Sequence, residues 1–164
     1  MSRREEEFER LYEEHAPGLL AFLAYRTGDR ALAEDLLADT FERVLRARRR
    51  FDPRRASAKT WVYSIALNLL RDQARRRDAE GRALGRAHAV VPFEGPSALD
   101  RIAGRDELMR GLAGLSEEER EALALRYGAD LTLPEIAELS GEKLTTVEGR
   151  VYRGLRKLRE VLEG

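Results

Sequence analysis

The residues with the most distinctive chemistry lie in the segment TWVYSIALNLLRDQARRR, residues 60–77. Apolar residues recur there every three or four positions, which predicts an amphipathic helix with the buried stripe Trp61, Val62, Ile65, Ala66, Leu69 and Leu70. The other face carries Tyr63, Asn68, Arg71, Arg75 and Arg76, and the preceding residues add Arg48, Arg49, Arg50, Arg54, Arg55 and Lys59. Aromatic rings that stack on bases, beside cations that bind phosphates, suit single-stranded nucleic acid. A helix with a solvated basic face fits this segment equally well on its own.

Other kinds of chemistry have few candidate residues. The chain has no cysteine, and its two histidines, His15 and His88, are far apart in sequence, so a zinc or redox site is not expected. No paired acid and base or activated nucleophile is evident. We therefore predict no catalytic residue, no bound metal, no cofactor and no small-molecule substrate.

The formal net charge of zero conceals a segregated distribution. Residues 1–45 carry 6 basic and 11 acidic side chains, whereas residues 46–77 carry 11 basic and 2 acidic ones. Residues 78–125 are acidic again, with 6 basic and 10 acidic side chains, and residues 126–164 carry 7 of each. An anion-binding surface and acidic surfaces for a basic protein partner can therefore coexist.

Two further helical segments are expected before this basic region. Apolar residues between Phe8 and Leu23 predict the first, which Pro17 should kink or divide because proline lacks a backbone donor. Gly28 and Asp29 suit the end of that helix and the start of the next, over residues 31–46. The second helix has an acidic outer face whose simplest role is solubility. Phe51, after it, could belong to the core between the two helices or face a ligand, and the core is the favoured interpretation.

Residues 78–96 show no sustained period and hold three glycines and two prolines, so we predict a linker there. The chain is thus expected to be all-α, with a helical domain over residues 1–77 and a second over residues 97–164. In the second domain a helical segment from residue 97 to Leu112 comes first, and two capping-box patterns follow, Ser116 with Glu119 and Thr132 with Glu135. Thr145 or Thr146 is expected to cap the last helix.

This order of helices is typical of a helix-turn-helix, although an ordinary helical hairpin has the same spacing. In the helix-turn-helix interpretation, Thr145, Thr146, Glu148 and Gly149 face base edges, and Arg150 and Arg153 bind phosphates.

Three groups of residues resemble the extracytoplasmic-function sigma factors of bacterial RNA polymerase. They are Ala33-Glu34-Asp35-Leu36-Leu37 with Asp39-Thr40-Phe41, then Trp61-Val62 with Ala66, Asn68 and Asp72, and finally Glu135-Ile136-Ala137 with Thr146-Val147 and Arg150. The resemblance covers nearly the whole chain. It implies a subunit that directs core polymerase to promoters and helps to open the DNA.

The resemblance also implies roles for individual residues. Asp35, Asp39, Glu42 and Arg43 would dock on the largest subunit of core RNA polymerase. The downstream (minus-ten) promoter element would be recognised and opened by Arg49, Phe51, Arg54, Arg55, Lys59, Trp61, Tyr63, Asn68, Arg71, Arg75 and Arg76, with one base of the non-template strand held flipped. The helix-turn-helix would bind the upstream (minus-thirty-five) element. Family members commonly have an anti-sigma factor, which makes one a candidate partner.

The chain departs from the family's pattern at three positions. Ala38 stands where a glutamine is usual, Glu142 replaces an apolar turn residue, which Leu144 could offset by turning inward, and Gly149 replaces a serine. A stand-alone helix-turn-helix regulator and a helical interaction protein are the alternatives. No signal peptide or membrane-spanning run is evident, so we expect a cytoplasmic location.

Overall fold

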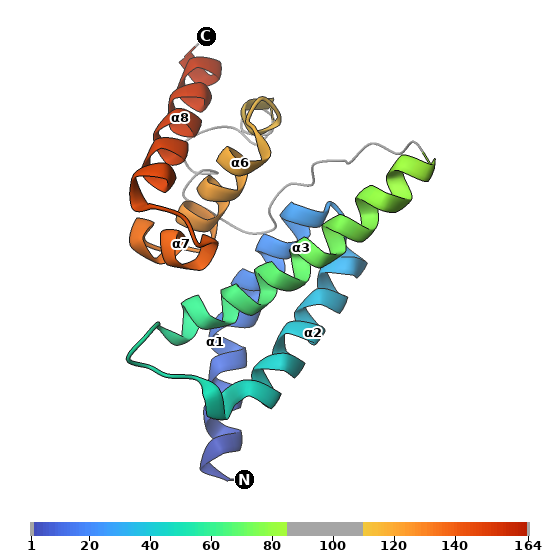
Figure 1. The fold of residues 1–164 in the computed structure, drawn as a ribbon, viewed down its shortest axis with the longest axis vertical. Coiled ribbons are helices and arrows are strands. Elements are labelled where there is room, and N and C mark those ends of the chain that lie inside the picture. The colour runs from blue at the N-terminus through green and yellow to red at the C-terminus, as the bar shows by residue number, and fades with distance from the viewer. Residues whose placement is uncertain (1, 85–109, 164) are drawn as a thin grey trace. The chain divides into compact units, whose positions relative to one another are not determined.

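The computed structural model describes residues 2–84 and 110–163, and it divides the chain into two compact units, residues 1–91 and 92–164. Within the described residues every regular element is a helix. The predicted all-α class is confirmed. In the N-terminal unit the helices α1, α2 and α3 pack on one another as a three-helix bundle (Figure 1).

The first helix, α1 (Arg3–Thr27), begins at a capping box between Ser2 and Glu5 and runs through Pro17 without a break. The expected division at Pro17 is therefore wrong. A proline removes one backbone donor, and the buried side chains on both sides of it keep the helix continuous. Gly28 ends α1 in the left-handed conformation (φ 71°), and the Asp29 side chain accepts from the Leu32 amide to start α2 (Arg30–Ala47), as predicted.

The third helix, α3 (Ala58–Leu84), follows a short 3₁₀ turn, η1 (Arg48–Arg50), and a loop. It continues seven residues beyond Arg77, so the first part of the predicted linker is helical. Ala, Glu, Arg and Leu in this stretch favour helix, and the single Gly81 costs only about 1 kcal/mol. Residues 85–96 of the predicted linker lie outside the described residues.

The core of the N-terminal unit contains Leu19, Phe22 and Leu23 of α1, and Tyr63 and Leu67 of α3 contribute to it. Tyr63 is only 1% exposed, and its ring meets the Phe22 ring edge to face at 5.9 Å. The expectation that Tyr63 lies on the exposed face of the helix is wrong. The buried stripe of α3 is displaced from the predicted one, because helices α1 and α2 both pack against it: Tyr63 and Leu67 are buried, whereas the predicted Trp61 and Ile65 are only half-buried.

The C-terminal unit is built from α6 (Glu117–Leu123), the π-helical turn η2 (Ala124–Gly128), α7 (Leu133–Ser140) and α8 (Leu144–Glu163). Both predicted capping boxes, Ser116 with Glu119 and Thr132 with Glu135, are present. Gly141 ends α7 with a positive φ of 68°. The preceding helical segment predicted from residue 97 lies mostly outside the described residues.

Helix α8 begins earlier than expected. Leu144 is its first residue, and the Thr146 and Val147 amides bond to the Lys143 carbonyl at 3.1 and 3.2 Å. Thr145 and Thr146 therefore lie within the first turn and do not cap the helix. Leu144 is 40% exposed, so the expectation that it turns inward is also wrong.

Candidate nucleic-acid interface

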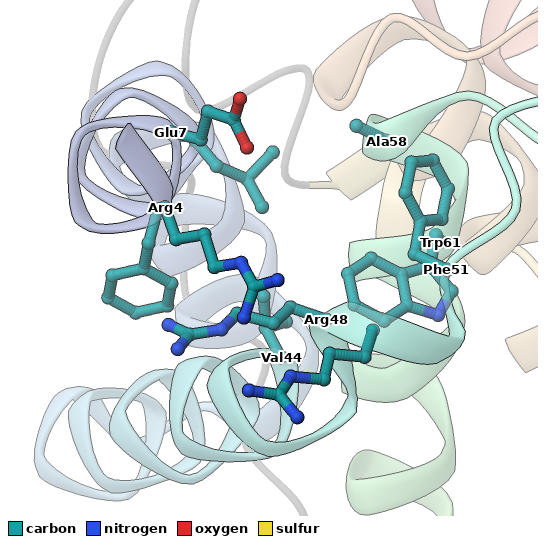
Figure 2. A pocket seen from close by; sticks show the side chains of 10 residues that line it. Arg4, Glu7, Val44, Arg48, Phe51, Ala58 and Trp61 are labelled. Carbon is teal, nitrogen blue, oxygen red and sulfur yellow. The ribbon is translucent and has the colours of Figure 1, made fainter. Parts of the chain in front are cut away.

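The N-terminal unit holds a pocket of about 610 Å³ where three segments meet (Figure 2). Arg4 and Phe8 reach it from α1, Arg48 from η1 and Phe51 from the loop after it, and Ala58 and Trp61 from α3. The volume falls in the range of roughly 300–1,000 Å³ that is usual for small-molecule sites. The pocket can hold a ring system the size of a nucleobase.

Two aromatic rings form one wall of this pocket. The Phe51 ring stacks on the indole of Trp61, with 4.8 Å between centroids and 29° between planes. Both side chains are half-buried, so the expectation that Phe51 belongs to the core is wrong. The local chain places Trp61 here because Ser57 caps α3: its hydroxyl accepts from the Thr60 amide at 3.1 Å, and its carbonyl accepts from the Trp61 amide at 3.0 Å.

Three arginines, Arg4, Arg48 and Arg49, line the same pocket. None of them forms an ion pair with any residue in the part of the chain that the structure describes. The one acid of the lining, Glu7, is paired with Arg3 at 3.3 Å. The pocket therefore combines stackable rings with guanidinium groups whose charge is available to an anion.

Other arginines of the basic region are already engaged. Asp52 pairs with Arg54 at 3.4 Å and with Arg55 at 3.9 Å, and Asp72 pairs with Arg75. Arg77 donates to the Thr27 carbonyl at 2.7 Å, so it ties α3 to the turn between α1 and α2. Its role is structural.

The remaining predicted residues of α3 lie on its exposed side, outside the pocket. Asn68 and Arg75 follow Trp61 at successive spacings of seven, and Arg71 and Arg76 are exposed beside them. This line extends from the pocket along the helix. Lys59 is half-buried near His15, whose pKa is lowered by burial and also by the Lys59 charge.

Sequence reasoning missed Arg4 and Phe8 as pocket residues. Nothing in their local sequence marks them, because they reach the pocket only through the packing of α1 against α2 and α3. On α2, the residues expected to dock on polymerase are exposed, namely Asp35, Asp39, Glu42 and Arg43. Glu42 pairs with Arg46 at 2.6 Å.

In the C-terminal unit, Thr145, Thr146, Glu148 and Arg153 are exposed on the first turns of α8. Gly149 is half-buried, and a Cβ there would lie 3.0 Å from the Arg153 guanidinium. A short helix, a turn at Gly141 and this longer helix give the helix-turn-helix arrangement. Its first exposed turns can enter a DNA major groove.

Two cations of α8 are held by acids of the same unit. Arg150 Nη1 donates to Glu142 Oε1 at 2.6 Å, and this hydrogen bond raises the pKa of Arg150. Lys157 Nζ donates to Glu119 Oε1 at 2.7 Å, and Glu119 is 4% exposed. The Lys157 hydrogen bond is the main cause that lowers the pKa of Glu119 to about 2. Glu142, which replaces the apolar turn residue usual in the family, thus positions Arg150.

Matches to known families show the family of this chain. Sigma-70 region 2 matches residues 11–80, and Sigma-70 region 4 matches residues 105–158. The chain is 34% identical over 155 residues to RNA polymerase sigma factor CarQ of Myxococcus xanthus, which covers 94% of this chain and 88% of that protein. The chain belongs to the extracytoplasmic-function sigma factors.

Other relatives agree. This sigma factor is 31% identical over 158 residues to SigL of Mycobacterium tuberculosis, covering 93% of this chain and 87% of SigL. SigE of Mycolicibacterium smegmatis is 36% identical over 146 residues, but the match covers only 56% of SigE. The structure of RpoE from Bartonella quintana, in complex with the anti-sigma factor NepR, has a TM-score of 0.79 and 25% identity, covering 96% of this chain and 98% of that one.

This sigma factor therefore acts in transcription initiation by RNA polymerase, and a stand-alone regulator is not favoured. Within residues 2–84 and 110–163, no helix has both the length and the apolar character needed to cross a membrane.

Proposed function

We propose that the pocket of the N-terminal unit captures one extruded base of the downstream promoter element, and that this capture helps to open the DNA. The pocket carries the proposal, because it combines the stacked Phe51 and Trp61 rings with arginines that have no acid partner among residues 2–84 and 110–163. Extruding a base costs a few kcal/mol, and stacking on aromatic side chains returns ~1–3 kcal/mol per base. Capture of the open state thus offsets much of the cost of opening.

The exposed side of α3 extends this site. Asn68 and Arg71 lie on the same helix as Trp61 and are exposed. In the proposal, cations along this side follow the backbone of the displaced strand, and Asn68 offers its amide to a base edge. Tyr63 is not part of the site, because it is buried.

The C-terminal unit binds the upstream element in this proposal. Thr145, Thr146 and Glu148 are exposed at the start of α8, where a helix-turn-helix contacts base edges. Arg153 is exposed and suits a phosphate, whereas Arg150 is held by Glu142.

Core RNA polymerase and promoter DNA are the partners. We assign the exposed Asp35, Asp39, Glu42 and Arg43 of α2 to the polymerase contact, although solubility alone would also explain their exposure. An anti-sigma factor is a further proposed partner, supported by the related RpoE structure in complex with NepR.

The test uses holoenzyme assembled from the full chain and core polymerase. Fork-junction DNAs with a randomised downstream element are first selected for binding, and 2-aminopurine then replaces each single-stranded base in turn. We expect one position to show a fluorescence change on binding that the other positions do not show, because that base exchanges stacking on its DNA neighbours for contact with the protein rings. Trp61→Ala should remove that signal and weaken binding by about 5- to 150-fold.

The control is Tyr152→Ala, which removes an exposed aromatic side chain (67% exposed) from α8 and should leave the fluorescence unchanged. A parent holoenzyme that shows no fluorescence change at any position, or a Trp61→Ala variant equal to the parent, would contradict base capture in this pocket.

A further inference from the structure

We propose that the first two turns of α1 form part of the base-capturing site, with Arg4 binding the phosphate of the captured nucleotide and Phe8 contacting its base. This inference rests on the proposed function, because it assigns additional contacts in the same pocket. It adds α1 to the η1 turn and α3 as a segment that recognises the promoter strand.

The pocket's geometry supports the proposal. Arg4 lines the pocket on the side of α1, opposite the stacked Phe51 and Trp61 (Figure 2). Phe8, on the same helix, also lines the pocket. Figure 2 shows Arg4 reaching from α1 toward the Arg48 side of the opening. A base inserted beside Trp61 would therefore have the α1 residues on its other side.

These two residues lie outside the segment that the family defines. Sigma-70 region 2 matches residues 11–80, so Arg4, Glu7 and Phe8 precede it. The family match therefore assigns no role to Arg4 or Phe8.

The start of α1 is held firmly enough to present a side chain. Ser2 and Glu5 form a reciprocal capping box, and Arg3 pairs with Glu7 at 3.3 Å. The Phe8 ring meets the Phe41 ring edge to face, with 6.3 Å between centroids. Phe8 is thus anchored to α2 while it lines the pocket.

Electrostatics indicate the chemistry of the ligand. Arg4, Arg48 and Arg49 surround one opening, and within the described residues none has an acid partner. Arg4 also lies in the first turn of α1, where the helix macrodipole disfavours a cation. Three like charges at one opening and a cation at a helix N-terminus both raise the free energy of the folded chain. A bound anion would reduce both of these costs. A phosphate with an attached aromatic base satisfies the arginines and the rings together.

The experiment compares holoenzymes carrying Arg4→Ala, Phe8→Leu and the control Arg10→Ala, an exposed arginine of the same helix. Binding to the selected fork-junction DNA is measured at several salt concentrations. Arg4→Ala should weaken binding and reduce the salt slope by about 0.7, the value for one phosphate contact on a single strand. Phe8→Leu should weaken binding by about fivefold or more and make the 2-aminopurine fluorescence change on binding smaller.

Two measurements separate this role from a structural one. The affinity of each variant for core polymerase should equal that of the parent, and Arg4→Ala should not lower thermal stability, because it removes a cation from a helix N-terminus.

The failures are distinguishable. If Trp61→Ala weakens binding while Arg4→Ala matches Arg10→Ala in affinity and salt slope, base capture in the pocket is supported and the proposed α1 contacts are wrong. If Trp61→Ala itself has no effect, the proposed capture of a base fails, and the α1 contacts fail with it.

Discussion

The two units treat the cations beside their proposed DNA sites differently. In the N-terminal unit, Arg4, Arg48 and Arg49 surround a pocket and form no ion pair within the described part of the chain. In the C-terminal unit, Arg150 is held by Glu142 and Lys157 by the buried Glu119. The N-terminal pocket therefore leaves its arginines available to a ligand, whereas the C-terminal unit holds Arg150 and Lys157 in ion pairs within its own fold.

This difference explains how a chain with a formal net charge of zero can still bind DNA at one site. Available arginines favour a flexible, highly charged single strand, which can bring phosphates to them. Internally paired cations lower nonspecific affinity for duplex DNA, since fewer counterions are released. A protein that acts only with polymerase can rely on such weak duplex binding, and isolated chain should bind duplex promoter poorly.

The largest effect is expected where a paired cation supports the fold. Lys157→Met leaves the Glu119 carboxylate buried without its main partner, which should destabilise the C-terminal unit by about 1–3 kcal/mol. Hydrogen exchange of the α6 and α8 amides measures the loss. The control is Arg156→Met, an exposed cation on the same helix, which should change protection little.

The same pair predicts a pH dependence. The pKa of Glu119 is lowered from 4.5 to about 2 in the folded protein, so ionised Glu119 favours the folded state. This stability is fully present above about pH 4.5 and is lost as the pH falls toward 2. The Lys157→Met variant should lose less of its unfolding free energy than the parent between pH 4.5 and pH 2. Equal acid sensitivity in parent and variant would mean that Lys157 is not the cause of the shift.

Local signals in the sequence predicted where most helices begin and end. Gly28, Asp29 and the Ser116 and Thr132 capping boxes act within a few residues, so their effect does not depend on distant packing. Gly81 does not end α3, because the stretch after Arg77 has no proline before residue 92 and a single glycine only weakens a helix.

Contacts between helices were harder to predict. Trp61 and Tyr63 are two positions apart, and spacing alone placed Trp61 in the core and Tyr63 at the surface. The packing of α1 and α2 decides otherwise, since Tyr63 meets Phe22 and Trp61 meets Phe51. Arg4 has no local signal at all. Its place in the pocket follows only from the tertiary arrangement.

A second test gives the pocket the kind of acid partner that the C-terminal unit already has. Ala58 lines the pocket at the first position of α3, where a carboxylate is compatible with the helix macrodipole. Ala58→Glu should neutralise one pocket arginine, weaken binding of fork-junction DNA and lower the salt slope by about 0.7. Thermal stability should not fall.

Ala58→Gln is the matched control, because it adds nearly the same volume without charge. Weaker binding in both variants would show that the pocket is sensitive to filling alone. An unchanged salt slope in Ala58→Glu would show that the pocket arginines do not contact phosphate.

The smallest effect concerns Arg150, which the sequence alone assigns to a phosphate. Its pairing with Glu142 at 2.6 Å neutralises most of that contribution, so Arg150→Ala should change the salt slope of upstream-duplex binding by well under one unit. Glu142→Gln keeps the shape of the turn and frees the guanidinium, which should tighten binding and steepen the slope by up to about 0.9. Arg150→Ala in that background should then remove the gain. If Arg150→Ala lowers the salt slope equally with and without Glu142, the ion pair opens when DNA binds. The charge of Arg150 would then be available to DNA, as the charges of the pocket arginines are in the N-terminal unit.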